Sequence, residues 1–199
     1  MYYLLTLEPV YSSTAQLTTC LIYGVTSIIV LGTSTTYHFL YDGFHISNRL
    51  ERFLEDCDHF AIYLFIAGTY TPFVWNAVAP PWRGILLALV WIIAIVGILY
   101  THFKPRLPIW AQHRFLYTGI FIALGWTGIV RFQEISQSLQ PDSKLYLFLG
   151  GMCYSLGAVV YATKWPRLWP GTFGFHELWH VAVLVGFGFH YFMVLSFYT

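Results

Sequence analysis

Five polar residues stand out in this otherwise apolar chain because their spacing could support chemistry. His176 and His180 are four residues apart, as are Ser34 and His38, and Asp58 begins a later apolar stretch. Residues i and i+4 of a helix lie one turn apart on the same face, so His176 and His180 can point at one ion. Imidazole nitrogens with a carboxylate and a hydroxyl close by are suited to binding and using a metal.

Each of these residues also has a plain structural interpretation. A histidine in a membrane can donate across helices to a carbonyl group. Asp58 can cap a helix N-terminus, and Ser34 can bond back to its own helix. Among the neighbouring candidates, we expect packing roles for His59 and His190, and Cys57 is a weaker ligand candidate than the histidines.

The stretch from His176 to His180 also matches the H-E-x-x-H pattern of soluble metalloproteases, in which the glutamate is the general base. Glu177 would then stand in the first turn of a helix near the membrane surface. A carboxylate is expected there from the helix dipole alone. We therefore keep a membrane-embedded protease only as an alternative.

The elements that must position these residues are membrane helices. The chain has 199 residues, of which 57% are hydrophobic, 20% aromatic and 10% charged, whereas soluble domains carry roughly 25% charge. A bilayer solvates the outward apolar faces of such helices directly. The net charge is +1 and no basic run occurs, so nothing indicates binding to nucleic acid or a polybasic lipid-binding patch.

Six apolar runs are long enough to cross a bilayer, which takes roughly 20 residues. Charged or helix-breaking residues separate these runs. The runs cover approximately residues 18–40, 58–79, 84–103, 114–131, 145–163 and 176–198. The sequence therefore predicts an all-α fold, a polytopic transmembrane helical bundle that forms one domain over residues 1–199.

Lysine and arginine are distributed unevenly between the two ends of these spans. The side that follows spans one, three and five carries Arg49, Arg52, Lys104, Arg106, Arg114, Lys164 and Arg167. The opposite side carries Arg83, Arg131 and Lys144. Because short cytoplasmic loops retain positive charge, the first side is predicted to be cytoplasmic and the C-terminus to be outside.

This topology brings the chemically useful residues to one membrane level. His38 ends an inward-running span, Asp58 starts an outward-running one, and His176 and His180 start another. Three neutral imidazoles with one open position are the ligand set of a catalytic zinc site. We therefore predict these three histidines as Zn²⁺ ligands, with Asp58 holding or activating a zinc-bound water and Ser34 donating to that water or to a developing oxyanion.

Three separated motifs also resemble one protein family. They are STTYH at 34–38, DHFAIY at 58–63 running into AGTYTPF at 67–73, and HELWH at 176–180. In this order they resemble the bacterial hemolysin III family, which belongs with the adiponectin and progestin receptors and more distantly with alkaline ceramidases. The resemblance covers the chain from about residue 20 to its end.

The resemblance implies a protein of the bacterial cell membrane with seven helices, a cytoplasmic N-terminus and an outside C-terminus. It also implies a zinc site near the cytoplasmic face. The ligands carry over onto His38, His176 and His180, and the water-associated residues onto Ser34 and Asp58. Six spans are apparent, so the family's first helix is absent here or reduced to residues 1–11.

The leading functional hypothesis is a zinc-dependent integral membrane hydrolase of a lipid amide or ester, with Asp58 as general base and Ser34 assisting. Membrane lipids would be both its surroundings and its substrate source. An alternative from another class is a receptor or sensor with a structural zinc that pins the first and last helices. A membrane-permeabilising hemolysin ranks last, because no amphipathic insertion segment or pore-lining ring of charge supports it.

Overall fold

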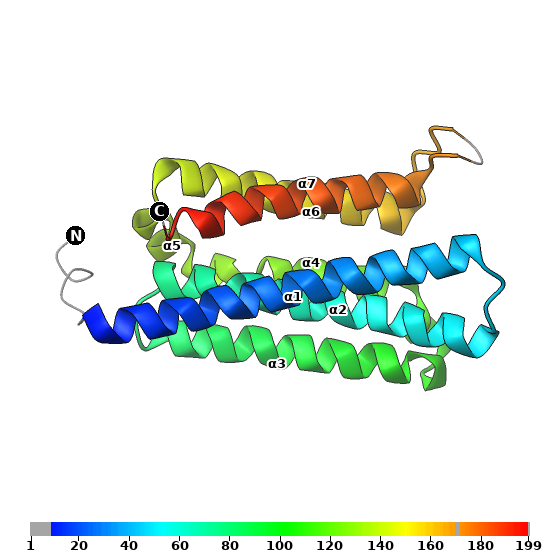
Figure 1. Ribbon diagram of the computed structural model, residues 1–199, viewed down its shortest axis with the longest axis horizontal. Helices are drawn as coiled ribbons and strands as arrows, with labels where there is room; N and C mark the ends of the chain where they lie inside the picture. Colours follow the sequence, from blue (N-terminus) through cyan, green and yellow to red (C-terminus); the bar gives the residue numbers. More distant parts are fainter. Residues whose placement is uncertain (1–8, 170–171, 199) are drawn as a thin grey trace. The chain divides into compact units, whose positions relative to one another are not determined.

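The computed structural model describes residues 9–169 and 172–198 (Figure 1). This part of the chain contains α-helices and short 3₁₀-helices, and it has no β-strand. The α-helices are α1 (Pro9–Gly43), α2 (Asn48–Ala77), α3 (Trp82–Phe103), α4 (Arg114–Gly125), α5 (Phe132–Ser138), α6 (Pro141–Thr163) and α7 (Phe175–Leu195). The 3₁₀-helices are η1 (Lys104–Arg106), η2 (Ile109–Gln112) and η3 (Thr127–Arg131). The predicted all-α fold class is confirmed.

Five helical stretches in the described residues are long and apolar enough to cross a membrane. They are Thr14–Tyr41, Trp82–Arg106, Arg114–Ser138, Pro141–Thr163 and Phe175–Leu195. Each of them contains or overlaps one predicted span. The remaining predicted span, 58–79, lies almost wholly in α2 but is not among the five, because residues such as Thr69, Thr71 and Asn76 interrupt its apolar run.

Helix α2 begins earlier than its predicted span. Its first residue is Asn48, and the Ser47 side chain caps it by accepting a hydrogen bond from the backbone N–H of Leu50 at 3.4 Å. Asp58 therefore lies well inside the helix, and the interpretation of Asp58 as a helix N-cap is wrong. The charged residues before Asp58 resemble a loop in hydropathy, but they form the first turns of this helix.

The predicted span 114–131 is also not one uninterrupted α-helix. Helix α4 ends at Gly125, the backbone tightens into η3, and α5 then runs to Ser138. Gly125 and Gly128 have low helix propensity. The indole N–H of Trp126 donates to Ser155 Oγ of α6 at 2.9 Å, which ties the break in the helix to a neighbouring helix.

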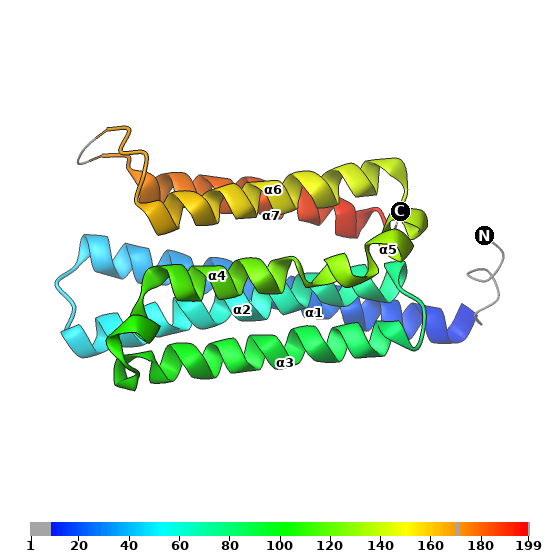
Figure 2. The ribbon, with the colours of Figure 1, turned by 180° about the vertical axis from the view of Figure 1, so that it is seen from behind.

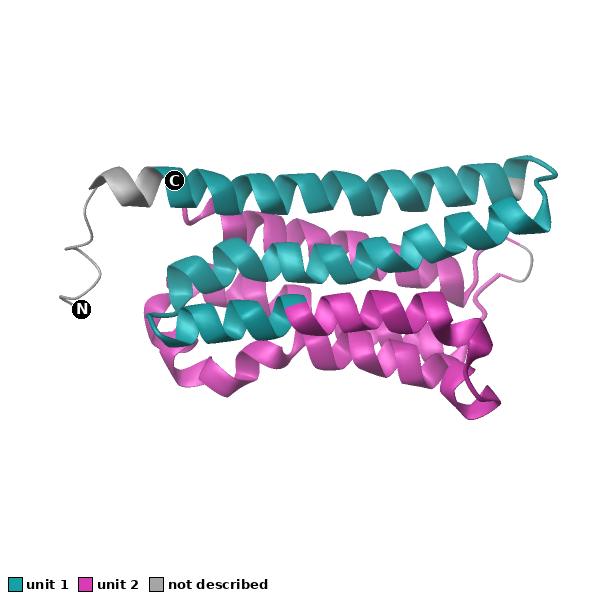
Figure 3. Ribbon diagram, turned by 90° about the horizontal axis from the view of Figure 1, so that it is seen from below, with its two compact units in different colours: residues 1–91 teal, residues 92–199 magenta. Residues whose placement is uncertain are grey.

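The chain divides into two compact units, residues 1–91 and 92–199, coloured separately in Figure 3. In the first unit, α1 and α2 are connected by a short turn and pack together along their length (Figure 1). Gly68 of α2 permits this approach, since a Cβ there would lie 2.0 Å from Thr26 Oγ1 of α1. The first turns of α3 join α2 through a hydrogen bond of 3.2 Å from the Trp91 indole to Thr71 Oγ1.

In the second unit, α6 and α7 form the closest helix pair (Figure 2). Two glycines leave room for aromatic or imidazole rings of the opposite helix. A Cβ on Gly150 of α6 would lie 2.2 Å from His190 Cδ2, and one on Gly186 of α7 would lie 3.0 Å from Tyr154 Cε1. Small residues at membrane helix contacts let backbones approach closely, and here they also fix the register of α6 against α7.

Residues 1–8, which form most of the stub proposed for the family's first helix, lie outside the described residues; Pro9–Tyr11 begin α1. That the chain forms one domain stays a prediction.

Candidate metal centre

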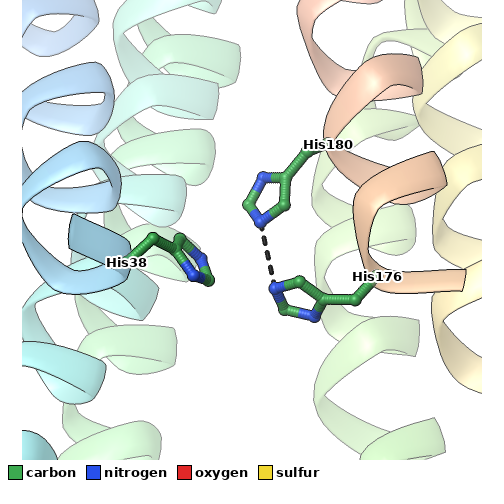
Figure 4. Close-up of side chains that lie close together, drawn as sticks. All are labelled: His38, His176 and His180. Carbon is green, nitrogen blue, oxygen red and sulfur yellow. Dashed lines mark hydrogen bonds between the residues drawn. The ribbon is translucent and has the colours of Figure 1, made fainter. Parts of the chain in front are cut away.

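The histidine pair stands at the start of α7. Glu177 fixes this helix start, since its Oε2 accepts a hydrogen bond from the Gly174 backbone N–H at 2.7 Å. One turn apart, His176 and His180 direct their Nε2 atoms toward each other at a distance of 3.0 Å (Figure 4). Two nitrogens bound to one tetrahedral zinc at 2.0–2.1 Å would lie about 3.3 Å apart. The pair therefore has nearly the spacing of two ligands on one ion.

Aromatic rings hold these imidazoles in place. The centroid of the His176 ring lies 6.0 Å from that of Tyr161 on α6 and 5.7 Å from that of Trp179. The Trp179 ring also lies 4.7 Å from that of His180. Trp179 could have been recognised from its spacing of three residues after His176, but Tyr161 carries no sequence signal, because its contact depends on how α6 packs against α7.

In the first unit, Ser34 and His38 lie on α1 as predicted, and both side chains are half-buried. The ring of Tyr37 lies 4.9 Å from that of His38. Within the described residues Ser34 Oγ makes no hydrogen bond, whereas Ser27 and Thr33 of the same helix donate to backbone carbonyl groups one turn earlier. The alternative in which Ser34 bonds back to its own helix therefore has no hydrogen bond among the described residues to support it.

Asp58 is a buried carboxyl group on α2, with 6% of its surface exposed. A buried carboxyl group is costly to retain in a membrane protein without a partner or a function. Its burial agrees with a role at a site rather than at a solvated helix end. The catalytic roles of Asp58 and Ser34 stay predictions.

The three histidines meet the chemical requirement for a metal site. His176 and His180 of the second unit each offer one ring nitrogen as a possible metal ligand, and His38 of the first unit offers another. Their side chains are drawn in Figure 4, and all three are half-buried. Imidazole suits zinc, copper, iron and nickel, so the donors fit the predicted Zn²⁺ without selecting it.

The polar residues expected to have packing roles have other contacts. His59 Nδ1–H donates to the Glu55 carbonyl of its own helix at 2.8 Å. His190 Nε2–H donates to the Leu147 carbonyl across the α6–α7 contact at 3.3 Å. Cys57 is a free thiol that lines a recess of about 200 Å³ with residues of α1 and α2.

The protease alternative has less support once Glu177 is placed. In H-E-x-x-H metalloproteases the glutamate is free to act as a base beside the metal. Here the Glu177 carboxylate is engaged with the N–H of Gly174 at the helix start, and the side chain is exposed. Its position is accounted for by helix capping.

Comparisons with known proteins agree with the predicted family. A family model described as Haemolysin-III related matches residues 1–191. The chain is 34% identical to Hemolysin-3 of Bacillus cereus over 174 residues, which is 87% of this chain and 72% of that protein. It is 31% identical to the Hemolysin-3 homolog of Bacillus subtilis (strain 168) over 185 residues, 93% of this chain and 79% of the relative.

The chain is also similar, at lower identity, to a protein named as a receptor. The chain is 29% identical to the Adiponectin receptor protein of Drosophila melanogaster over 182 residues, which cover 83% of this chain and 39% of that protein. The helices that are long and apolar enough to cross a membrane, together with the bacterial relatives, identify an integral membrane protein. The chain belongs to the Haemolysin-III related family.

Proposed function

We propose that this protein is a zinc-dependent integral membrane hydrolase that cleaves a lipid amide or ester. The observation that carries the proposal is the pair of Nε2 atoms of His176 and His180, 3.0 Å apart at the start of a membrane helix. Such a site would be in reach of lipid acyl chains. His38 is proposed as the third ligand, on the ground that the predicted topology brings the end of α1 and the start of α7 to the same membrane face.

Each proposed residue has one task. The three imidazoles hold the ion and leave one position open. Zinc, when bound, would polarise the lipid carbonyl group and supply a nucleophile at neutral pH. Asp58 removes a proton from the attacking water and passes it to the leaving group, as a general base and then a general acid. The Ser34 hydroxyl, which makes no hydrogen bond among the described residues, donates to the charge that develops on the carbonyl oxygen.

A receptor with a structural metal is the second candidate. It is favoured by the similarity to a protein named Adiponectin receptor protein, which is 29% identical to this chain. In this alternative the histidines hold α1 to α7, and no lipid is consumed. The two functions differ in what Asp58 contributes, since a purely structural metal needs no general base.

Lipid turnover tests the proposal. The full chain is purified with zinc in the growth medium, reconstituted with a bacterial lipid extract, and the extract is compared before and after incubation by mass spectrometry. We expect loss of an amide or ester lipid and gain of a fatty acid. His180→Ala should abolish both zinc binding and turnover, while His59→Ala, which removes a histidine bonded to its own helix, should retain both. A His180→Ala protein that loses zinc yet keeps full activity would contradict the proposal.

A further inference from the structure

Two cationic side chains lie on a pair of joined tyrosine rings in the second unit. Lys104 Nζ lies 4.7 Å from the centroid of the Tyr117 ring, and Arg114 Cζ lies 5.5 Å from that of Tyr161. The two tyrosines are connected by a hydrogen bond of 3.3 Å between their hydroxyl groups. Lys104 and Arg114 are both half-buried. These four residues, Lys104, Arg114, Tyr117 and Tyr161, are called the cation–tyrosine cluster below.

The cluster adjoins the histidine pair. The Tyr161 ring makes the cation–π contact with Arg114 and also contacts the ring of His176, with 6.0 Å between the two ring centroids. Arg114 Cζ additionally lies 6.0 Å from the centroid of Phe175, the residue before His176. Within this unit, α4 begins, α6 ends and α7 begins at the same end (Figure 2). A lipid bound at His176 would therefore have its polar part within reach of the cluster.

The donors of the cluster are only partly used. Arg114 Nη1 donates to the Tyr161 carbonyl at 3.1 Å, near the C-terminal end of α6, which leaves most of its five N–H donors available. The Lys104 ammonium group has three N–H donors. Of the residues that the structure describes, no carboxylate lies within ion-pair distance of either cation, and the recorded ion pair is Arg131 with Glu134.

Half-buried cations without a counter-ion favour an anionic ligand, because each has lost part of its water and an anion supplies the missing charge-assisted hydrogen bonds. We propose that the cation–tyrosine cluster binds the anionic headgroup of the lipid substrate, through Lys104 and Arg114. The substrate class is then a lipid amide or ester that carries a phosphate or another anionic group. This proposal rests on the proposed function, since it places the headgroup beside the histidines.

Calorimetric titration of the full chain in phosphatidylcholine nanodiscs tests the cluster. The probes are dioctanoyl phosphatidic acid, dioctanoyl phosphatidylcholine and inorganic phosphate. We expect the wild-type protein to bind the phosphatidic acid at least about tenfold more tightly than the phosphatidylcholine, the size of one charge-assisted hydrogen bond. Lys104→Gln and Arg114→Gln should each reduce that preference to about threefold or less.

The controls separate the cluster from general surface charge. Arg167→Gln removes an exposed arginine and should leave the preference intact. Arg114→Lys keeps the charge without the forked donor geometry and should show an intermediate preference. If Arg114→Gln loosens the end of α6, Lys104→Gln still tests the cluster, because Lys104 makes no hydrogen bond to α6 among the described residues.

Four outcomes decide between the two proposals. An unchanged preference in Lys104→Gln and Arg114→Gln would overturn the headgroup site, even if the wild-type protein hydrolyses lipid. Complete displacement of the phosphatidic acid by an equal concentration of inorganic phosphate would assign the cluster to free phosphate and also overturn it. A cluster-dependent preference without turnover of any lipid would overturn the proposed hydrolase and the substrate assignment together, while the anion site would stand. A preference lost in both variants, with anionic lipid hydrolysed faster than neutral lipid, supports both proposals.

Discussion

The Nε2 atoms of His176 and His180 lie 3.0 Å apart on successive turns of α7. The helix start that positions them is fixed by Glu177, whose side chain accepts a hydrogen bond from Gly174 N–H. The glutamate of the H-E-x-x-H motif thus caps the start of the helix, and the two histidines of the motif are proposed metal ligands. One short motif therefore contains a structural residue between two proposed ligands.

The role of Asp58 distinguishes a hydrolase from a receptor with structural zinc. Loss of a general base lowers turnover by about 10²–10⁴-fold. We expect Asp58→Ala to lower lipid turnover by at least about 100-fold while zinc content stays at the wild-type level. Asp56→Ala, two residues earlier in α2, is the matched control and should retain turnover. Equal turnover in the wild-type protein and Asp58→Ala would exclude Asp58 as the base.

The α6–α7 contact gives a stability prediction. The ring of His190 lies against Gly150 and is held at 5.2 Å, centroid to centroid, by the ring of Tyr154. Because that ring has little room to shift, Gly150→Ala should lower the free energy of unfolding by about 1–3 kcal/mol. Gly151→Ala is the control, since nothing lies within 4 Å of a Cβ there, and it should raise stability by up to about 1 kcal/mol through helix propensity.

Thermal unfolding in a mild detergent measures both variants under the same conditions. A Gly150→Ala protein with a midpoint at or above that of Gly151→Ala would show that α6 and α7 do not depend on this close approach.

Much of the fold was predictable because bilayer thickness and apolar composition constrain helices strongly. The residues at which helices start and end were harder to predict. Polar residues before Asp58 resembled a loop, although Ser47 is a recognisable cap for a helix that begins at Asn48. The break after Gly125 depends partly on the bond from Trp126 to Ser155, which is a contact between helices distant in sequence.

The candidate site divides in the same way. The spacing of His176 and His180, and of Ser34 and His38, could be read from the sequence because helical periodicity alone puts each pair on one face. The contact of the Tyr161 ring with His176 could not be predicted from the sequence, and neither could the cation–tyrosine cluster. Those contacts arise from tertiary packing of α4, α6 and α7, for which one sequence offers no local signal.

Membrane topology is a separate prediction. The excess of lysine and arginine after spans one, three and five places the C-terminus outside. A pair of reporters fused after Thr199 checks this, one active only in the cytoplasm and the other only outside it. We expect activity from the outside reporter alone. Activity from the cytoplasmic reporter alone would reverse the orientation and put the proposed metal centre at the outer face.

The zinc content of the purified protein tests the central claim most directly. The wild-type chain, grown with zinc and freed of loosely bound metal, should contain about one zinc per chain. His38→Ala, His176→Ala and His180→Ala should each reduce this to near zero, while His59→Ala should keep it. A wild-type protein without zinc, or a full complement of zinc in any of the three ligand variants, would contradict the account.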